Sequence, residues 1–226
     1  MRAVGVIGAG QMGAGIAQVS AAAGYHVYLS DIDLAKAEAG KANIANALAR
    51  LVAKEKMGQD AADTLLSRIE PVASYEPMAD AGLIIEAATE REDIKRKIFE
   101  AVGKILGDQA VLASNTSSIP ITRLAQSSPD PKRFIGVHFF NPVPVMGLIE
   151  IIRGLATTDA TVDIVRQYGE ALGKQLVFAN DAPGFIVNRV LMPMINEAVY
   201  TLYEGVGSVK AIDQSMRLGA NHPMGP

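Results

Sequence analysis

Short apolar runs alternate with helix-like patterns from residue 3 to residue 180 of the chain. The first run, residues 3–7, ends in a glycine loop, and an alanine-rich stretch with helical spacing follows until Gly24, which can end a helix. A second run, Val27–Ser30, ends at Asp31. Strand, tight turn, helix and strand in this order predict a right-handed βαβ unit, and hence a parallel sheet. The chain is therefore predicted to have a doubly wound α/β fold.

The same alternation predicts further strands and helices along the chain. The strands are expected at residues 82–87, 110–114, 134–137, 148–152 and 175–178, and the helices at 91–106 and 159–172. Residues 34–68 depart from the alternation, because they read as two consecutive helical segments, 34–56 and about 60–68. This pair is longer than an ordinary crossover, so we expect it to project from the sheet.

The pattern changes at Asn180–Gly184, where Pro183 suits the first turn of a helix. Apolar residues then recur at helical spacing until Gly205, and a shorter helix is expected around 208–218. We therefore divide the chain into a sheet domain, residues 1–182, and the beginning of an all-α domain, residues 183–226. So short a helical segment cannot bury a core alone. It must pack on the first domain, on further sequence or on another subunit.

Composition excludes several classes of function. Half of the 226 residues are apolar (49%), the formal net charge is −3, and basic blocks are absent, which argues against nucleic acid as a partner. The chain has no cysteine, so disulfides and thiolate chemistry are impossible, as fits a reducing cytoplasm. The uncharged stretch 3–25 is rich in glycine and lacks leucine, unlike a signal peptide or a membrane span. We expect a mature, soluble, cytoplasmic protein that does not enter a membrane.

The glycine loop has the spacing of a dinucleotide-binding turn. Gly8, Gly10 and Gly13 would provide a tight turn, close approach of the backbone to a pyrophosphate, and close helix–strand packing. Asp31 follows at about the distance expected for an acid that binds both ribose hydroxyls. An anion there would repel a 2′-phosphate, so NAD is favoured over NADP, and the fold is Rossmann-type. The alternative is a tight βα turn that binds no nucleotide. The loop residues expected to meet the cofactor are Gly8, Gly10, Gln11, Met12 and Gly13.

Polar residues follow three of the predicted strands. Ala88–Glu90 comes after one strand, Ser114–Ser118 after the next, and His138 after a third. Ligands of open α/β sheets bind beyond the carboxyl ends of the strands, so these residues are candidates for a binding site. Helix capping explains one residue of the serine-rich run but not the whole set.

His138 is the candidate general base among the three histidines. It ends a buried strand and faces Glu150 across a loop stiffened by Pro142 and Pro144. A carboxylate beside an imidazole sets its tautomer, raises its basicity and stabilises the imidazolium that forms when it takes a proton. The pair predicts oxidation of an alcohol, in which the hydroxyl proton leaves as hydride moves to the nicotinamide. The alternative is a core histidine with a structural role only.

Two further observations complete the candidate chemistry. Asn188 lies on the first turns of the helix after Pro183, where an amide is costly if it faces the core, although capping or solvent exposure also accounts for it. Pro193 predicts a kink in the same helix. No metal site is predicted.

Seven segments spread over nearly the whole chain resemble the 3-hydroxyacyl-CoA dehydrogenase family, most closely its short-chain bacterial members that act on 3-hydroxybutyryl-CoA. The HFFNP and PGFIVNR sequences are much more specific than the glycine loop. The segments are GAGQMGAGIAQ (8–18), IEAATE (85–90), SNTSSI (114–119), HFFNPVPVM (138–146), LIEIIRG (148–154), DAPGFIVNRV (181–190) and INEA (195–198).

The resemblance implies reversible, NAD-dependent oxidation of (S)-3-hydroxyacyl-CoA to 3-ketoacyl-CoA. His138 would be the general base and Glu150 its orienting partner. Ser117 would hydrogen-bond the 3-oxygen of the substrate, and Asn188 would help hold the thioester arm and the His–Glu pair. The NAD site would be lined, with the glycine loop and Asp31, by Glu90, Lys95, Asn115, Ser117 and Asn141.

The resemblance also implies partners and a longer polypeptide. The projecting pair at 34–68 would help bind coenzyme A, with Lys54 meeting a phosphate, unless Lys54 is simply a solvated helix charge. Members of the family continue beyond the position of Pro226 through helices that complete the substrate pocket and carry much of a homodimer contact. The chain is therefore expected to be a shortened form whose helical domain is only begun.

Two other classes share some of these features. β-Hydroxyacid dehydrogenases open with GxGxMG but carry their proton on a lysine of a glycine-rich helix, whereas the helix after Pro183 offers Asn188 and Arg189. A non-catalytic NAD(H)-binding protein, such as a crystallin or a sensor, would be expected to lack His138 or Glu150. Turnover separates a sensor from an enzyme.

Overall fold

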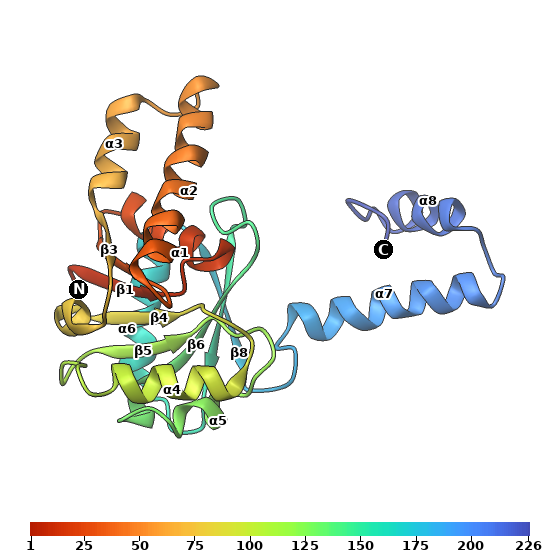
Figure 1. Ribbon diagram of the computed structural model, residues 1–226. Helices are drawn as coiled ribbons and strands as arrows, with labels where there is room; N and C mark the ends of the chain where they lie inside the picture. The colour runs from red at the N-terminus through yellow and green to blue at the C-terminus, as the bar shows by residue number, and fades with distance from the viewer. The chain divides into compact units, whose positions relative to one another are not determined.

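A computed structural model describes all residues, 1–226, as two compact units, Met1–Ala182 and Pro183–Pro226 (Figure 1). The first contains an eight-stranded sheet in the order β3-β2-β1-β4-β5-β6-β7-β8. Every neighbouring pair is parallel except β6 and β7, which are antiparallel. The predicted doubly wound, mainly parallel sheet is confirmed. The strands are β1 (Ala3–Ile7), β2 (His26–Ser30), β3 (Ile69–Val72), β4 (Leu83–Glu86), β5 (Val111–Ser114), β6 (Phe134–Phe139), β7 (Leu148–Arg153) and β8 (Gln175–Asn180).

Helices cover both faces of the sheet, as right-handed crossovers require. Helices α1 and α6 share one face, where a buried hydrogen bond of 2.6 Å joins Ser20 of α1 to Tyr168 of α6. Helices α4 and α5 lie on the other face (Figure 1). Buried aliphatic residues of the central strands form the core between these layers. The helices of this unit are α1 (Gln11–Ala22), α2 (Leu34–Ala53), α3 (Gln59–Ser67), α4 (Glu92–Val102), α5 (Ile121–Ala125) and α6 (Asp159–Ala171), with 3₁₀ turns η1 (Glu76–Asp80) and η2 (Pro131–Arg133).

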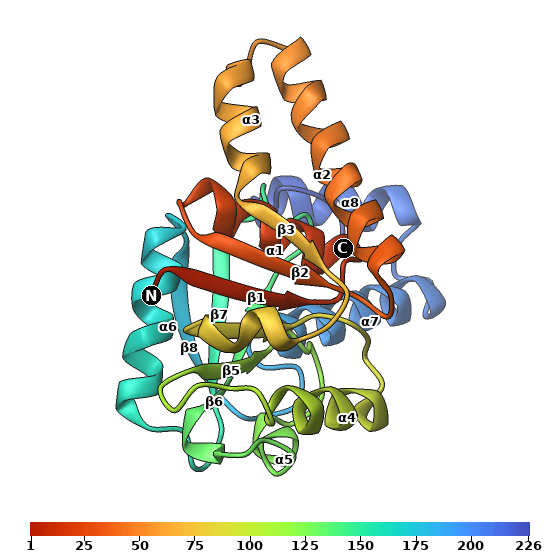
Figure 2. The same ribbon diagram turned by 60° about the vertical axis from the view of Figure 1, so that its left-hand side comes forward.

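Helices α2 and α3 form the projecting pair that the sequence predicts (Figure 2). The Asp33 side chain caps α2 by accepting a hydrogen bond from the backbone N–H of Lys36 at 2.8 Å. Ile44 and Leu48 of α2 are buried, and Leu65 of α3 is buried with them in the core. The far ends of both helices are largely exposed, so the pair stands out from the sheet instead of covering it.

Strand β3 is the one strand that the sequence pattern did not predict. It has only four residues, one of which is Pro71, and it pairs with β2 alone, at the edge of the sheet. Proline lacks a backbone N–H and is tolerated in a sheet mainly at edges, so the sequence carries a signal against a strand here. Strand β2 begins at His26, which pairs with Ala3 of β1 and lies 3.1 Å from Glu70 of β3.

The turn after β1 requires glycine for two different reasons. Gly8 has a positive φ of 101°, and a Cβ at this position would meet the backbone oxygen of Ala87 at 2.6 Å. Gly13, in the first turns of α1, packs its Cα against the backbone of Gly8 so closely that no side chain fits. Gly10 has open space around it, so no internal contact of the turn excludes a side chain there.

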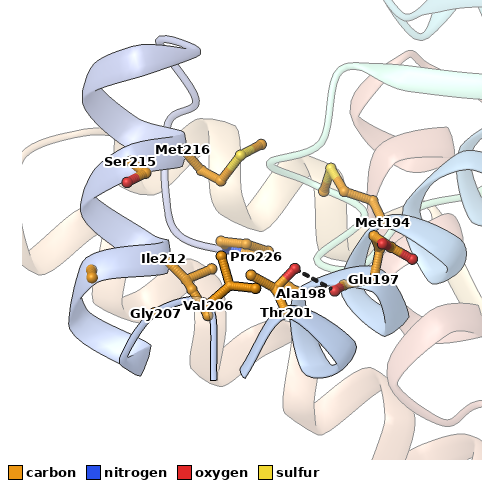
Figure 3. A pocket seen from close by; sticks show the side chains of 11 residues that line it. Met194, Glu197, Ala198, Thr201, Val206, Gly207, Ile212, Ser215, Met216 and Pro226 are labelled. Atoms are coloured by element: carbon orange, nitrogen blue, oxygen red, sulfur yellow. Dashed lines mark hydrogen bonds between the residues drawn. The ribbon is translucent and has the colours of Figure 1, made fainter. Parts of the chain in front are cut away.

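The second unit contains two helices, α7 (Val187–Tyr203) and α8 (Val209–Gly219), joined through Gly205 at φ 70°. Pro193 lies inside α7. No residue of either helix is fully buried. Their apolar side chains enclose a hollow of about 430 Å³, lined among others by Met194, Ile212 and Met216 (Figure 3). Two helices with this much exposed apolar surface agree with the expectation that they cannot form a core of their own.

Substitution of Gly8 tests how tightly the turn is packed. Gly8→Ala should lower the free energy of unfolding by about 1–3 kcal/mol more than Gly24→Ala, because overpacking adds to backbone strain. Gly24 is the matched control, since its φ is 96° but nothing lies within 4 Å of a Cβ there. Urea denaturation of the two variants measures the difference, and equal losses would mean that only the backbone conformation matters.

Candidate active site

Four strand ends of the first unit surround one hollow of about 480 Å³. The carboxyl ends of β1, β4, β5 and β6 lead into its walls, as expected for ligand sites of open α/β sheets. The lining residues are Gly10, Gln11, Met12, Ala87, Ala88, Thr89, Glu90, Lys95, Asn115, Ser117, His138, Phe139, Phe140 and Asn141. The hollow therefore brings together the glycine loop, the serine-rich loop and the candidate histidine.

The glycine turn fits a dinucleotide pyrophosphate. Gly10 is the residue before α1 and lines the hollow, and the open space about it lets a ligand approach the backbone. Helix α1 begins at the hollow, where backbone N–H groups and the helix dipole favour a phosphate. Asp31 supports the turn from β2, because its Oδ2 accepts a 2.6 Å hydrogen bond from the N–H of Ala9. Its Oδ1 accepts one from the N–H of Ile32 at 2.7 Å.

His138 and Glu150 are direct partners across the antiparallel pair β6–β7. The Nδ1 of His138 lies 2.8 Å from the Oε2 of Glu150, and both side chains are buried. Residues directly opposite each other on antiparallel strands point to the same face, so the strand register itself brings the two side chains together. With Nδ1 directed at the carboxylate, Nε2 is the ring nitrogen suited to exchange a proton with a ligand in the hollow.

Glu90 holds the serine-rich loop in place. Its Oε1 accepts hydrogen bonds from the hydroxyls of Thr116, Ser117 and Ser118, at 2.7–3.1 Å, and from the backbone N–H groups of Ser117 and Ser118. Burial acts to raise the pKa of Glu90, but the hydrogen bonds from Thr116 and Ser118 and the charge of Lys95 outweigh it and hold the pKa below its ordinary value. The half-exposed carboxylate is thus kept ionised at neutral pH.

The two asparagines occupy different parts of the hollow. Asn115 follows β5, and its Oδ1 accepts a 2.8 Å hydrogen bond from the backbone N–H of Phe139, next to His138. This bond ties the serine-rich loop to the strand that carries the histidine. Asn141 lies in the loop between β6 and β7, and its peptide bond to Pro142 is cis.

Several predicted site residues lie outside the lining of the hollow. Gly8 and Gly13 allow the close packing of the glycine turn, and Asp31 accepts a hydrogen bond from it, but none of the three lines the hollow. Lys54 is exposed at the end of α2, away from the lining. Asn188 is the second residue of α7 and belongs to the other unit.

Sequence reasoning overlooked three charged residues that hold segments of this unit in place. Glu86 ends β4 and is fully buried beneath the hollow. Lys174 donates hydrogen bonds to the carbonyl oxygens of Val143 and Met146, at 2.8 and 2.6 Å, and so holds the β6–β7 loop. Asp181 accepts hydrogen bonds from the first N–H groups of α5 at 2.8 Å. Of the three, only Glu86 leaves a signal in the sequence, because it is a charged residue at the end of an otherwise apolar strand, Leu83–Glu86.

The two units match two sequence profiles of one family. Residues 3–182 match the NAD-binding domain of 3-hydroxyacyl-CoA dehydrogenase, and residues 184–226 match its C-terminal domain. The chain belongs to the 3-hydroxyacyl-CoA dehydrogenase family. Its first unit is accordingly the NAD-binding domain of such an enzyme.

Individual relatives agree with this assignment. A 3-hydroxybutyryl-CoA dehydrogenase of Bradyrhizobium diazoefficiens is 53% identical over 226 residues, which is 100% of this chain and 77% of the relative. A probable 3-hydroxybutyryl-CoA dehydrogenase of Bacillus subtilis is 48% identical, with 98% of this chain and 77% of the relative covered. The crystal structure of the (S)-3-hydroxybutyryl-CoA dehydrogenase of Ralstonia eutropha superposes with a TM-score of 0.97 at 48% identity, over 100% of this chain and 80% of that one.

No helix of this 3-hydroxyacyl-CoA dehydrogenase has the length and apolar character needed to cross a bilayer.

The lowered pKa of Glu90 makes the stability of its loop depend on pH. A carboxyl group whose pKa is lower in the folded protein stabilises it above the ordinary pKa of about 4.3, and this contribution is lost as the pH falls through the folded value. Glu90→Gln should therefore lower the free energy of unfolding at pH 7. The gap in free energy of unfolding between the variant and the unsubstituted protein should close below about pH 4. Urea denaturation of both proteins from pH 7 to pH 3.5 measures the gap. A gap that stays constant over this range would rule out an ionised Glu90 as the stabilising group.

Proposed function

We propose that the protein catalyses reversible, NAD-dependent oxidation of (S)-3-hydroxyacyl-CoA to 3-ketoacyl-CoA, with 3-hydroxybutyryl-CoA as its substrate. One observation carries the chemistry: a buried imidazole lies 2.8 Å from a buried carboxylate and lines the hollow of an NAD-binding domain. The names of the similar proteins support the choice of a short acyl chain.

His138 is the proposed general base. Its Nδ1–H would donate to the Glu150 carboxylate, which would set the tautomer, and Nε2 would take the hydroxyl proton of the substrate. Glu150 then stabilises the imidazolium that forms, because the pair is buried and poorly screened by solvent. Bound NAD supplies the hydride acceptor for the same alcohol. In the reverse direction the imidazolium returns the proton to the oxygen.

Substrate positioning is proposed for two further side chains. Ser117 lines the hollow, and its hydroxyl, which donates to Glu90 in this structure, would turn its proton to the 3-oxygen when substrate binds. Asn188, on α7, would hold the thioester arm and the His–Glu pair. Together with His138 and Glu150, they make up the proposed catalytic set.

The glycine turn and its surroundings are the proposed NAD site. Gly8, Gly10 and Gly13 bring the backbone to the pyrophosphate, and Asp31 would accept hydrogen bonds from the ribose hydroxyls while disfavouring a 2′-phosphate. Asp31 also bonds the N–H of Ala9, so its carboxylate is pre-oriented at the edge of the turn. The residues proposed to line the rest of the NAD site are Gln11, Met12, Glu90, Lys95, Asn115, Ser117 and Asn141.

Coenzyme A and a second subunit are the proposed partners. The projecting pair α2–α3 would contact coenzyme A, with the exposed Lys54 meeting a phosphate. The helical unit would mediate a homodimer, which its exposed apolar residues, such as Val199 and Tyr203, support. A cytoplasmic location remains a prediction of the sequence.

The other two classes fit less well. Helix α7 contains no lysine that would serve as the proton carrier of a β-hydroxyacid dehydrogenase. A sensor or crystallin needs no proton acceptor, whereas His138 and Glu150 are both present and in contact.

A direct assay tests the proposed function and its cofactor. Acetoacetyl-CoA should oxidise NADH, followed as loss of the nicotinamide absorbance, and kcat/KM should be at least about tenfold lower with NADPH, because hydrogen bonds to a charged group contribute about 1.5–3 kcal/mol. A protein that binds NADH without consuming acetoacetyl-CoA would be a sensor. Equal use of NADPH would contradict the role of Asp31.

Substitution of the histidine tests the base. His138→Gln should lower kcat about 10²–10⁴-fold, since it removes general-base catalysis, while NADH binding measured by fluorescence is retained. His26→Gln is the matched control, because His26 also pairs with a glutamate, Glu70 at 3.1 Å, but on the half-exposed edge of the sheet. Near-normal turnover of His138→Gln would show that another group takes the proton.

A further inference from the structure

Glu86 is a fully buried carboxylate that the proposed mechanism leaves without a role. It ends β4 beneath the hollow, and three donors from three different segments converge on it. Its Oε1 accepts the backbone N–H of Ala88 at 2.9 Å, and its Oε2 accepts the Ser114 hydroxyl at 2.8 Å and the Lys95 ammonium at 2.6 Å. Ala88 and Lys95 line the hollow, whereas Glu86 does not.

Lys95 depends on this carboxylate. The residue is 1% exposed, so its ammonium has lost almost all contact with water and must be compensated by fixed acceptors. Glu86 at 2.6 Å is the short contact, while the second carboxylate, Glu90, lies 3.7 Å away and the Ser114 oxygen 3.4 Å away. Removing the charge of Glu86 would leave a buried cation with a distant, half-exposed counterion.

The contacts continue from Lys95 toward the reacting end of the site. Glu90, the second carboxylate near the ammonium, holds Thr116, Ser117 and Ser118 through its other oxygen. An ammonium that is no longer held by Glu86 would move toward Glu90 and compete for that carboxylate. The serine-rich loop would then lose part of its anchor.

Glu86 also supports the glycine turn. The peptide it fixes at Ala88 is the one against which Gly8 packs, since a Cβ on Gly8 would meet the Cα of Ala88 at 2.6 Å. Ile7, the residue before Gly8, is the register partner of Glu86 on β1. The Glu86 carboxylate therefore orients two parts of the proposed dinucleotide site, the Lys95 ammonium and the Ala88 peptide beside the glycine turn.

We propose that Glu86 is a positioning residue of the cofactor site, which acts by holding the Lys95 ammonium at the wall where NAD is bound. The proposal rests on the cofactor part of the proposed function and not on the identity of the acyl substrate. A carboxylate that served stability alone would affect unfolding without acting through Lys95 on the cofactor.

Binding of NADH to the full chain, measured by fluorescence without acyl-CoA, tests the proposal with a double-mutant cycle. Glu86→Gln keeps the shape but removes the charge, and should weaken NADH binding about tenfold, as should Lys95→Met. The double variant E86Q/K95M should bind NADH within about twofold of Lys95→Met alone, because Glu86 then has no ammonium to hold. Tyr168→Phe is the control for stability, since it removes a buried hydroxyl whose 2.6 Å hydrogen bond joins α1 and α6.

The outcomes separate the two roles. Undiminished NADH binding by Glu86→Gln, or losses that multiply in the double variant, would overturn the proposal, and so would an equal weakening in Tyr168→Phe. If Glu86→Gln does not fold, the double variant, which removes both charges and leaves no unpaired buried ion, is compared with Lys95→Met. Clearly weaker NADH binding by the double variant than by Lys95→Met would then overturn the proposal. Failure of the unsubstituted protein to consume acetoacetyl-CoA while it binds NADH would contradict the proposed function alone.

Discussion

The antiparallel pairing of β6 with β7 is the constraint on which the candidate site depends. All other strand pairs of the sheet are parallel, and parallel strands would carry the segment after His138 away through a crossover. The reversal instead returns the chain along β6 at once, and its register sets Glu150 opposite His138. A shift of one residue would turn Glu150 to the other face of the sheet and separate the pair. The short loop between the strands, held by Lys174, preserves that register.

Three glutamates around the hollow differ in what compensates their charge. Glu150 is buried against an imidazole, Glu86 is buried against an ammonium and two neutral donors, and Glu90 is half-exposed and bonded mainly by hydroxyls and backbone N–H groups. Three carboxylates in one site can therefore have different roles, depending on the partner that compensates each charge. In the proposed mechanism Glu150 orients a base whose charge changes during the reaction, whereas Glu86 and Glu90 hold neighbouring side chains and backbone in place. Burial without a partner would be costly for Glu86 and Glu150, which are fully buried.

Most strands and helices, and the boundary between the two units, were predictable because they depend on the local pattern of apolar and turn residues. The first βαβ unit, the projecting helices and the change of pattern near Pro183 all leave a period or a turn residue in the sequence. Strand β3 leaves neither, because four edge residues with a proline gain their pairing from β2 and not from their own composition. The position of Glu70 beside His26 likewise appears only in the folded sheet, where β2 lies between β1 and β3.

For the site, the sequence by itself determined which chemical groups are present: a glycine turn, an acid after the second strand, a histidine at a strand end and a carboxylate beyond the next loop. Only the tertiary structure decided which of them meet. It joined His138 to Glu150, tied Glu90 to the serine-rich loop and set Glu86 beneath Lys95, with Lys54 left at the exposed end of α2. The reason is physical. Periodicity and turn chemistry act over a few residues, whereas hydrogen bonds between side chains of different strands depend on sheet order and register, which arise only when the whole core packs together.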